Sequence, residues 1–243
     1  MRYLLTIEYL GKNYSGWQRQ ENACSVQAVV EESLSEFFKE KITVFASGRT
    51  DKGVHALGQT VHFDAEMVIP ARNLPMAVNH LLPDDIKIRK AQVVDDCFHA
   101  RYDAKKKTYI YKFYIDKIAS PTKSLTHALL KPPLDITKMQ AACLDLLGTH
   151  DFACLSATGS SAKTSIRTVY EAHIKQYGDE IIFTITASGF LYNMVRMIAG
   201  TLAFIAQGKR EQNTFKALLS TQDKKLRGKT YPPEGLYLAR VYY

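Results

Sequence analysis

One acid lies in a short loop that is otherwise basic and rich in glycine. Residues 47–56 read SGRTDKGVHA, and Asp51 is the only carboxylate among them. Gly48 and Gly53 allow the backbone a positive φ angle or a close approach to a ligand. A carboxylate presented in this way can act as a nucleophile or as a general base. The alternative interpretation is an Asp-containing turn with solvated neighbours.

A single arginine interrupts the most apolar stretch of the chain. Residues 189–206 are nearly all apolar, and Arg196 lies between Val195 and Met197. The stretch is short and polar at its centre, which favours a buried helix ending near residues 207–208 over a membrane span. An uncompensated buried charge costs several kcal/mol. The guanidinium must therefore reach solvent or meet a carboxylate, and Asp51 is a natural candidate.

The composition indicates a folded protein with a polyanionic partner. Its 243 residues suffice for one large or two modest domains, and 46% of them are hydrophobic against 23% charged. The net charge is +8 and the isoelectric point is near 9.2. Such an excess favours nucleic acid as the partner, although many basic proteins bind no polyanion.

Several site classes find no support in the sequence. Four cysteines lie far apart without a C-x-x-C pair, which argues against a zinc knuckle and a dense disulfide framework and favours a reducing cytoplasm. They are Cys24, Cys97, Cys143 and Cys154. The N-terminus lacks the apolar core of a signal peptide. The segment 228–230 resembles the end of a phosphate-binding loop, but Asp223 stands where that loop requires glycine.

Strands and helices are expected around the Asp51 loop in the first half. Strands are predicted at 3–9, 42–47, 60–64 and 86–94 from the apolar pattern. A helix begins after Ser25, a suitable N-cap, and a shorter one follows Pro70 and ends before Pro83. His55 and His62 in this half are expected to be structural.

The second half begins after a basic hinge at residues 98–107. Strands are predicted at 108–115 and 236–243, a helix at 136–147 closed by Gly148, and a hairpin of 166–177 and 180–187 joined at Gly178-Asp179. Both halves read strand, helix, strand, strand, which suggests a weak internal duplication of an α+β unit.

Taken together, these segments resemble the A-type tRNA pseudouridine synthases. The matching motifs follow the family's order along the whole chain: Gly16-Trp17-Gln18-Arg19-Gln20, Gly48 to Ala56 with Gln59, Phe98-His99-Ala100-Arg101, Lys107-Thr108-Tyr109-Ile110-Tyr111, Phe190-Leu191 with Met194-Val195-Arg196, and Pro233-Glu234-Gly235-Leu236-Tyr237-Leu238. The Asp51 loop is the most specific of them. Two segments depart from the family pattern, since Leu10 replaces an acid and residues 197–200 match only loosely.

The resemblance implies an α+β pseudouridine synthase fold, with two similar halves whose mainly antiparallel sheets meet at a central cleft. Residues 1–104 would form the half with the Asp51 loop, and residues 105–243 the other. The implied activity is isomerisation of uridine to pseudouridine in the anticodon stem-loop of tRNA, at positions 38–40. The implied enzyme is a cytoplasmic homodimer with tRNA as its partner, no membrane association, and neither metal nor cofactor.

The resemblance also implies a role for individual residues. Asp51 matches the catalytic aspartate, Arg196 its cationic partner, and Tyr109 the tyrosine that stacks on the target base. Arg49 would fill the gap left by the extruded nucleotide, because a base in a stack must be flipped out before it reacts. Tyr109 could instead be a core aromatic of its strand.

Further basic residues are candidates for contacts with RNA phosphates, although all of them could also be merely solvated. They are Lys105, Lys106, Lys107, Lys224, Lys225 and Arg227. Two other functions use the same features. A tRNA-binding or RNA-folding protein would lack the loop acid, whereas a retaining glycosidase would need two carboxyl groups about 5 Å apart.

Overall fold

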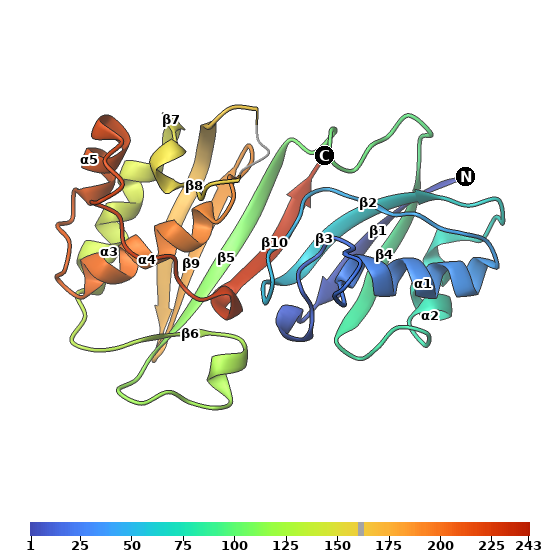
Figure 1. The fold of residues 1–243 in the computed structure, drawn as a ribbon, viewed down its shortest axis with the longest axis horizontal. Helices are drawn as coiled ribbons and strands as arrows, with labels where there is room; N and C mark the ends of the chain where they lie inside the picture. Colours follow the sequence, from blue (N-terminus) through green and yellow to red (C-terminus); the bar gives the residue numbers. More distant parts are fainter. Residues whose placement is uncertain (160–162) are drawn as a thin grey trace. The chain divides into compact units, whose positions relative to one another are not determined.

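The sheet of the first unit places the Asp51 loop directly before a central strand. In the computed structural model, which describes residues 1–159 and 163–243, the chain divides into unit 1 (Met1–Lys105 and Tyr237–Tyr243) and unit 2 (Lys106–Leu236). The strands of unit 1 are β1 (Arg2–Tyr9), β2 (Phe45–Ala46), β3 (His55–Asp64), β4 (Ile86–Val94) and β10 (Leu236–Tyr242). They follow the order β4-β1-β3-β10, and β2 pairs with β3 (Figure 1).

Two helices pack against the unit 1 sheet. Helix α1 (Val26–Phe38) begins as expected at Ser25, whose hydroxyl accepts the Ala28 N–H, and α2 (Leu74–Val78) carries Pro75 in its first turn. Phe38 of α1 contacts Phe63 of β3 edge to face, with ring centroids 5.5 Å apart. Burial of such rings supplies much of the stabilisation of a core of this size.

The last strand was not expected in unit 1. The sequence assigned residues 105–243 to the second half, whereas the structure places Tyr237–Tyr243 with unit 1 and Lys105 on the unit 1 side of the division. The cause is a parallel pairing of β10 with β3, in which Tyr237 lies opposite His55 and Leu238 opposite Ala56. The Lys105 N–H in turn donates to the Tyr242 carbonyl at 2.8 Å.

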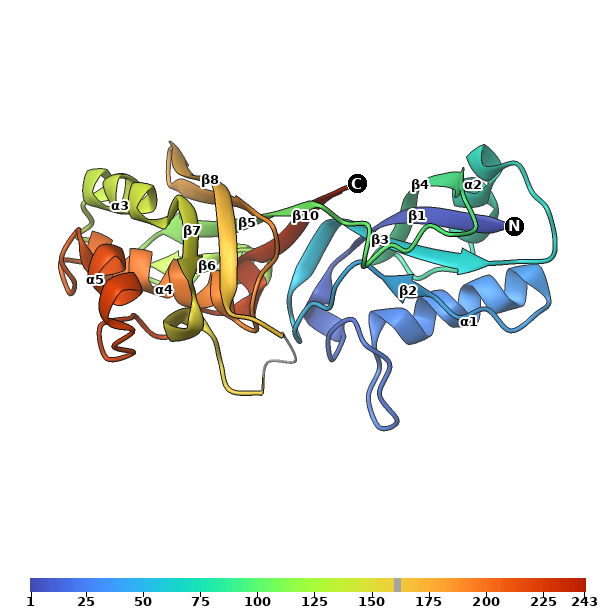
Figure 2. The ribbon, with the colours of Figure 1, turned by 90° about the horizontal axis from the view of Figure 1, so that it is seen from above.

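Unit 2 is built on mainly antiparallel strands. Its strands are β5 (Lys106–Ile115), β6 (Ala128–Leu130), β7 (Gly148–Asp151), β8 (Ile166–Tyr177) and β9 (Glu180–Ala187). They follow the order β5-β9-β8-β7, with β6 parallel to β5 (Figure 2). The β8–β9 hairpin has the predicted bounds, and Gly178 in its turn has a φ of +60°.

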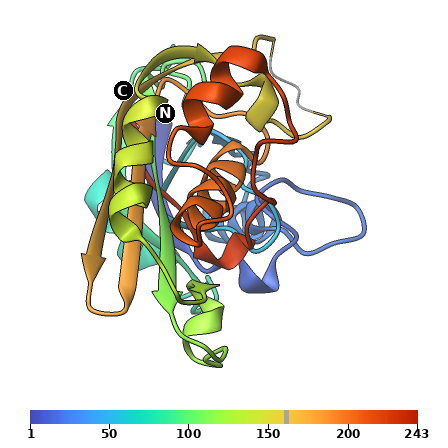
Figure 3. The ribbon, with the colours of Figure 1, turned by 90° about the vertical axis from the view of Figure 1, so that its left-hand side faces the viewer.

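The helices of unit 2 are α3 (Ile136–Ala142), α4 (Met194–Ala206) and α5 (Thr214–Thr221). Helices α3 and α4 pack on each other and contact β8 and β5, respectively (Figure 3). Almost all of α4 is buried and it ends next to residues 207–208, as predicted, and it occupies residues 194–206 of the apolar stretch. No helix in the described ranges combines the length and apolar character that a membrane crossing requires. The α+β fold with mainly antiparallel sheets is thus confirmed.

Three other expected elements have different bounds. The strand predicted at 42–47 is reduced to the two residues of β2, and β3 begins at His55 rather than at residue 60. The helix predicted at 136–147 ends at Ala142 and continues as a 3-10 turn to Leu146, before Gly148 with a φ of +99°.

Candidate active site

The start of the Asp51 loop is held by one glutamine. The Gln59 side chain lies on β3 and accepts the Ser47 hydroxyl at 2.9 Å, while its amide group donates to the Gly48 carbonyl at 2.8 Å. Gln59 is completely buried, so both hydrogen bonds are shielded from water. Between these anchors and Val54 the chain turns sharply, and the Val54 N–H donates to the Asp51 carbonyl at 3.1 Å.

A second brace comes from the segment that follows β1. The Trp17 N–H donates to the Thr50 carbonyl at 3.0 Å, and the Tyr9 and Thr50 hydroxyls are 2.7 Å apart. Burial raises the pKa of Tyr9, which therefore remains a neutral hydrogen-bonding partner at physiological pH. Residue 50 is thus fixed through both its backbone and its side chain, immediately before the candidate catalytic acid.

Two glycines allow this close packing. Gly16 has a φ of +97°, and a Cβ there would lie 2.7 Å from the Thr50 carbonyl oxygen. A Cβ on Gly11 would lie 2.0 Å from the Val54 carbonyl oxygen. Only glycine fits either position without displacing the loop backbone.

His55 anchors the end of the Asp51 loop, where β3 begins. Its ring is completely buried, and its Nδ1 accepts the Gly11 N–H at 2.9 Å. The ring also lies 4.7 Å from that of Tyr237 on β10. These contacts agree with the structural role expected for His55.

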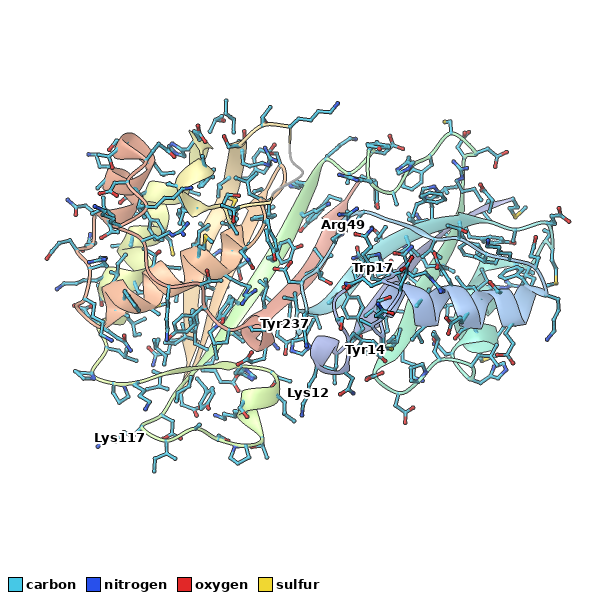
Figure 4. The ribbon with its side chains drawn as sticks, in the orientation of Figure 1. Lys12, Tyr14, Trp17, Arg49, Lys117 and Tyr237 are labelled. Carbon is cyan, nitrogen blue, oxygen red and sulfur yellow. The ribbon has the colours of Figure 1, made fainter. Side chains whose placement is uncertain are left out.

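The braced loop leaves its central side chains accessible. Arg49 and Lys52 are exposed and Asp51 is partly exposed, whereas the anchors on either side are buried. Arg49 lies at the same end of unit 1 as Trp17, Tyr14 and Tyr237 (Figure 4). The arrangement suits a fixed carboxylate that meets an incoming substrate, because catalytic groups act best when their geometry is set beforehand.

Unit 2 carries the other two expected site residues. Tyr109 lies on β5 and is partly exposed, and its ring packs edge to face on Phe190 with centroids 4.9 Å apart. This contact holds the ring in place without burying it completely. Such a ring can serve as a stacking surface for a base.

Arg196 lies in the first turn of α4 and is partly exposed rather than enclosed. Its Nε donates to the Tyr231 carbonyl at 2.8 Å, and one terminal nitrogen donates to the Asn193 side chain at 2.7 Å. Asn193 has a φ of +60°, which turns its side chain back toward this turn of the helix. The two hydrogen bonds fix the direction of the guanidinium.

Arg196 and Tyr109 are linked through neighbouring residues of unit 2. The Tyr111 hydroxyl, two residues from Tyr109 on β5, donates to the Pro232 carbonyl at 2.6 Å, next to the carbonyl that Arg196 binds. Burial raises the pKa of Tyr111 well above its usual value, and the Arg196 charge opposes that shift. Gly235 allows this contact, because a Cβ there would lie 2.6 Å from the Tyr111 ring.

Comparison with known proteins identifies the family. The family model described as tRNA pseudouridine synthase matches residues 5–103 and 142–243, which is most of the chain. This chain belongs to the tRNA pseudouridine synthase family. Members of the family are isomerases that act on tRNA, so the resemblance drawn from the motifs is confirmed.

Curated relatives of this family match over nearly their whole length. The tRNA pseudouridine synthase A of Thermoanaerobacter sp. (strain X514) is 43% identical over 240 residues, covering 99% of this chain and 98% of the relative. That of Exiguobacterium sp. (strain ATCC BAA-1283 / AT1b) is 40% identical over 242 residues, covering 100% and 98%. That of Ligilactobacillus salivarius (strain UCC118) is 42% identical over 246 residues, covering 100% and 96%.

The expected basic residues of this synthase differ in their surroundings. Lys105, Lys106, Lys224 and Lys225 are exposed, and Lys107 is partly exposed. Arg227 is partly buried, and one of its terminal nitrogens donates to the Cys154 carbonyl at 2.9 Å and contacts the Met197 sulfur at 3.3 Å. These bonds favour a packing role for Arg227 between α4 and the segment before β8.

Several residues that support the site were not assigned a role from the sequence. Tyr9 and Phe190 each contact a candidate residue or its neighbour from a distant segment, and Asn193 binds Arg196 three residues along the chain. Gln59 was recognised only as part of a motif. A buried glutamine following a glycine-rich loop is itself a signal, because its amide must find partners in the adjacent backbone. In the described ranges no group of three or more His, Cys, Asp or Glu side chains could hold a metal ion.

Proposed function

We propose that this synthase converts uridine to pseudouridine in the anticodon stem-loop of tRNAs, at positions 38–40, with Asp51 as the catalytic group. Family membership establishes the reaction class, and the observation that supports Asp51 is the loop itself. Its first two residues, Ser47 and Gly48, are fixed by Gln59, Thr50 is fixed by Tyr9 and Trp17, and the one carboxylate of the turn remains partly exposed.

The reaction needs no external group. The bond between C1′ of the ribose and N1 of uracil breaks, the base turns, and a new bond joins C1′ to C5. C5 loses its proton and N1 gains one, so the atoms and electrons balance. Asp51 acts as the nucleophile or the base in this sequence, and it must be ionised to do so.

The other residues position the substrate. Tyr109 stacks on the flipped uracil, and its hydroxyl assists the departure of the C5 proton. Arg49, exposed beside Asp51, occupies the gap left in the stem, which offsets part of the few kcal/mol that flipping costs. Arg196 is proposed as the cationic partner of the catalytic carboxylate, the role that the family resemblance gives to it.

The proposed tRNA contacts, oligomeric state and cellular compartment come from the same resemblance. Lys105, Lys106, Lys107, Lys224 and Lys225 are the proposed contacts to tRNA phosphates. We further propose that the enzyme works as a homodimer in the cytoplasm, without metal or cofactor.

Release of the C5 hydrogen tests the proposed function. A tRNA transcript made with tritium at C5 of its uridines should lose label to water when the protein is added, because every turnover replaces that hydrogen by a carbon bond. Transcripts in which residues 38, 39 and 40 are all cytidine should lose none. Binding without release would support the alternative of a tRNA-binding protein and contradict the proposal.

A further inference from the structure

A pocket in unit 2 lies outside the group of candidate catalytic residues. It has a volume of about 380 Å³ and is formed by the segments on both sides of residues 160–162, by Leu191 and by Lys224. Its charged and hydroxyl-bearing lining residues are Ser156, Thr158, Lys163, Thr164, Ser165 and Lys224. We infer that this pocket, called here the phosphate pocket, binds a backbone phosphate of the tRNA substrate. The inference rests on the proposed function.

The charge of the pocket favours an anion. Among the described lining residues, Lys163 and Lys224 are the charged ones, and both are exposed. Over the described ranges, neither ammonium group forms an ion pair with a carboxylate. Two positive charges at one pocket attract a phosphate, which carries its charge on oxygens that accept several hydrogen bonds.

The surroundings add further positive charge. Arg167 donates to the Thr164 carbonyl at 2.9 Å and to its hydroxyl at 3.2 Å, so a guanidinium lies against one wall. Arg227 lies near another wall, since it binds the Cys154 carbonyl, and its charge acts together with that of Lys224 to oppose the raised pKa of the Cys154 thiol.

The two nearby carboxylates are engaged with the backbone. Asp151 accepts the Ala153 N–H at 2.9 Å, and Asp223 accepts the Lys225 N–H at 2.9 Å. Neither carboxylate lines the pocket. Both keep their negative charge, but the cations Lys163, Lys224, Arg167 and Arg227 outnumber them, so the local balance of charge is positive.

The hydroxyl groups complete a set of donors. Thr164 receives its hydrogen bond from Arg167, which leaves its own O–H proton free to donate. Ser156 donates to the Ala157 carbonyl at 3.2 Å, a local bond that a stronger acceptor can replace. Hydroxyl and ammonium donors around one pocket can bind the several oxygens of a phosphate, whereas a purely apolar ligand would leave these donors without acceptors.

The position of the pocket relates it to the target base. Leu191 lines the pocket, and the preceding residue, Phe190, packs on Tyr109. The Ala157 N–H donates to the Tyr192 carbonyl at 3.0 Å, which fixes the pocket wall to the same segment. A phosphate held here would belong to a nucleotide close to the uridine that stacks on Tyr109.

Removing the two ammonium groups tests the inference. Lys163→Met and Lys224→Met keep most of the side-chain bulk and should each raise the KM for an unmodified tRNA transcript by about 5- to 30-fold, with kcat within about twofold of wild type. The slope of log KM against log salt should fall by about 0.7–0.9 for each phosphate that the variant no longer neutralises. Lys175→Met is the matched control, because Lys175 is an exposed lysine toward the far end of β8 and does not line the pocket.

A neutral phosphate analogue identifies the ligand. Single methylphosphonates placed along the anticodon stem-loop should include one position that weakens binding to the wild-type protein but not to the Lys163→Met/Lys224→Met variant. Binding that weakens equally in both proteins at every position would overturn the inference, as would variants whose KM and salt slope equal those of Lys175→Met. The methylphosphonate experiment measures binding directly, so it remains decisive even if no pseudouridine forms, an outcome that would instead refute the proposed function.

Discussion

Tyr109 combines two properties that substitution can separate. Its ring is held by Phe190 and remains partly exposed, and its hydroxyl is the group proposed to assist proton transfer at C5. Tyr109→Leu should lower kcat/KM by about 5- to 150-fold, because stacking of a base on an aromatic ring contributes about 1–3 kcal/mol. Tyr109→Phe should keep KM near wild type, and its fall in kcat measures the contribution of the hydroxyl. Steady-state tritium release provides both values.

The control for this pair is Tyr170→Leu, an exposed tyrosine of β8 in the same unit. It should leave both constants unchanged. If Tyr109→Leu were as active as Tyr170→Leu, Tyr109 would be only a packing residue of β5.

Arg196 should act through its fixed guanidinium. Arg196→Met removes the hydrogen bonds to Tyr231 and Asn193 together with the charge, and it should lower kcat/KM by at least about 100-fold. Arg196→Lys restores the charge but cannot form both bonds in the same geometry, so its activity should be intermediate.

A purely structural role for Arg196 makes a different prediction. Arg196→Met would then lower the thermal midpoint while the folded variant retained its kcat. If Arg196 acts in catalysis, adding Arg196→Met to an Asp51→Asn variant should lower kcat/KM little further, because the effects of substituting residues that act as a unit are not additive.

At the scale of elements, the close contact between the Gly16 segment and the Asp51 loop sets the position of the acid. Gly16→Ala should lower the free energy of unfolding by at least about 2 kcal/mol, since an L-residue is strained at positive φ and the new Cβ would meet the Thr50 carbonyl. The displaced loop should also reduce kcat. Chemical denaturation and tritium release measure the two effects.

Gly178→Ala separates strain from crowding. Gly178 also has a positive φ of +60°, but a Cβ there would have nothing within 4 Å. This variant should lose only about 1 kcal/mol and keep its activity. Equal effects of the two substitutions on kcat would contradict the role given to the Gly16 contact.

His62 makes the stability of unit 1 depend on pH. Burial, helped by the charges of His99 and Arg2, lowers the pKa of His62 to about 4, although Asp64 opposes the shift. The unfolded chain takes up this proton near pH 6.5, but the folded chain does so only near pH 4. The free energy of unfolding should therefore fall as the pH drops from about 6.5 to about 4, and this contribution becomes constant below that range.

Urea denaturation across this interval measures the effect. His62→Gln, which can still accept the Ala100 N–H that now donates to His62 Nδ1 at 3.1 Å, should show a shallower dependence than wild type. His80→Gln, at an exposed position, should leave the dependence unchanged. If the free energy of unfolding of His62→Gln depended on pH as steeply as that of wild type, groups other than His62 would cause the pH dependence.

Local signals predicted some elements well and others not at all. The Ser25 cap and the Gly178-Asp179 turn act on the residues next to them in the sequence. The start of α1 and the bounds of the β8–β9 hairpin are therefore as expected. The pairing of β10 with β3 joins residues far apart in sequence and could not be deduced from either segment alone. Helix α4 begins at Met194 because Asn193, at positive φ, cannot continue a helix toward residue 189.

The candidate site was predictable where residue type carries the chemistry. Asp51 stood out as the one acid of a basic loop, and Arg196 as the one cation of an apolar stretch. The supporting residues were not predictable in this way. Tyr9, Gln59 and Asn193 are ordinary residue types, and their roles depend on hydrogen bonds that only the folded chain reveals.

At the scale of the whole molecule, the central claim is that this chain forms pseudouridine in tRNA through Asp51. Wild-type protein and Asp51→Asn should be incubated with unmodified tRNA transcripts that carry uridine at 38, 39 and 40, and pseudouridine should be mapped at single-nucleotide resolution. Asp84→Asn is the matched control, because Asp84 is a fully exposed acid of the same unit.

We expect pseudouridine only within positions 38–40 for wild type and Asp84→Asn. With Asp51→Asn the rate should be lower by at least about 100-fold, while its affinity for tRNA stays near wild type. Pseudouridine formed by Asp51→Asn at the wild-type rate, or none formed by wild-type protein at positions 38–40, would contradict the account.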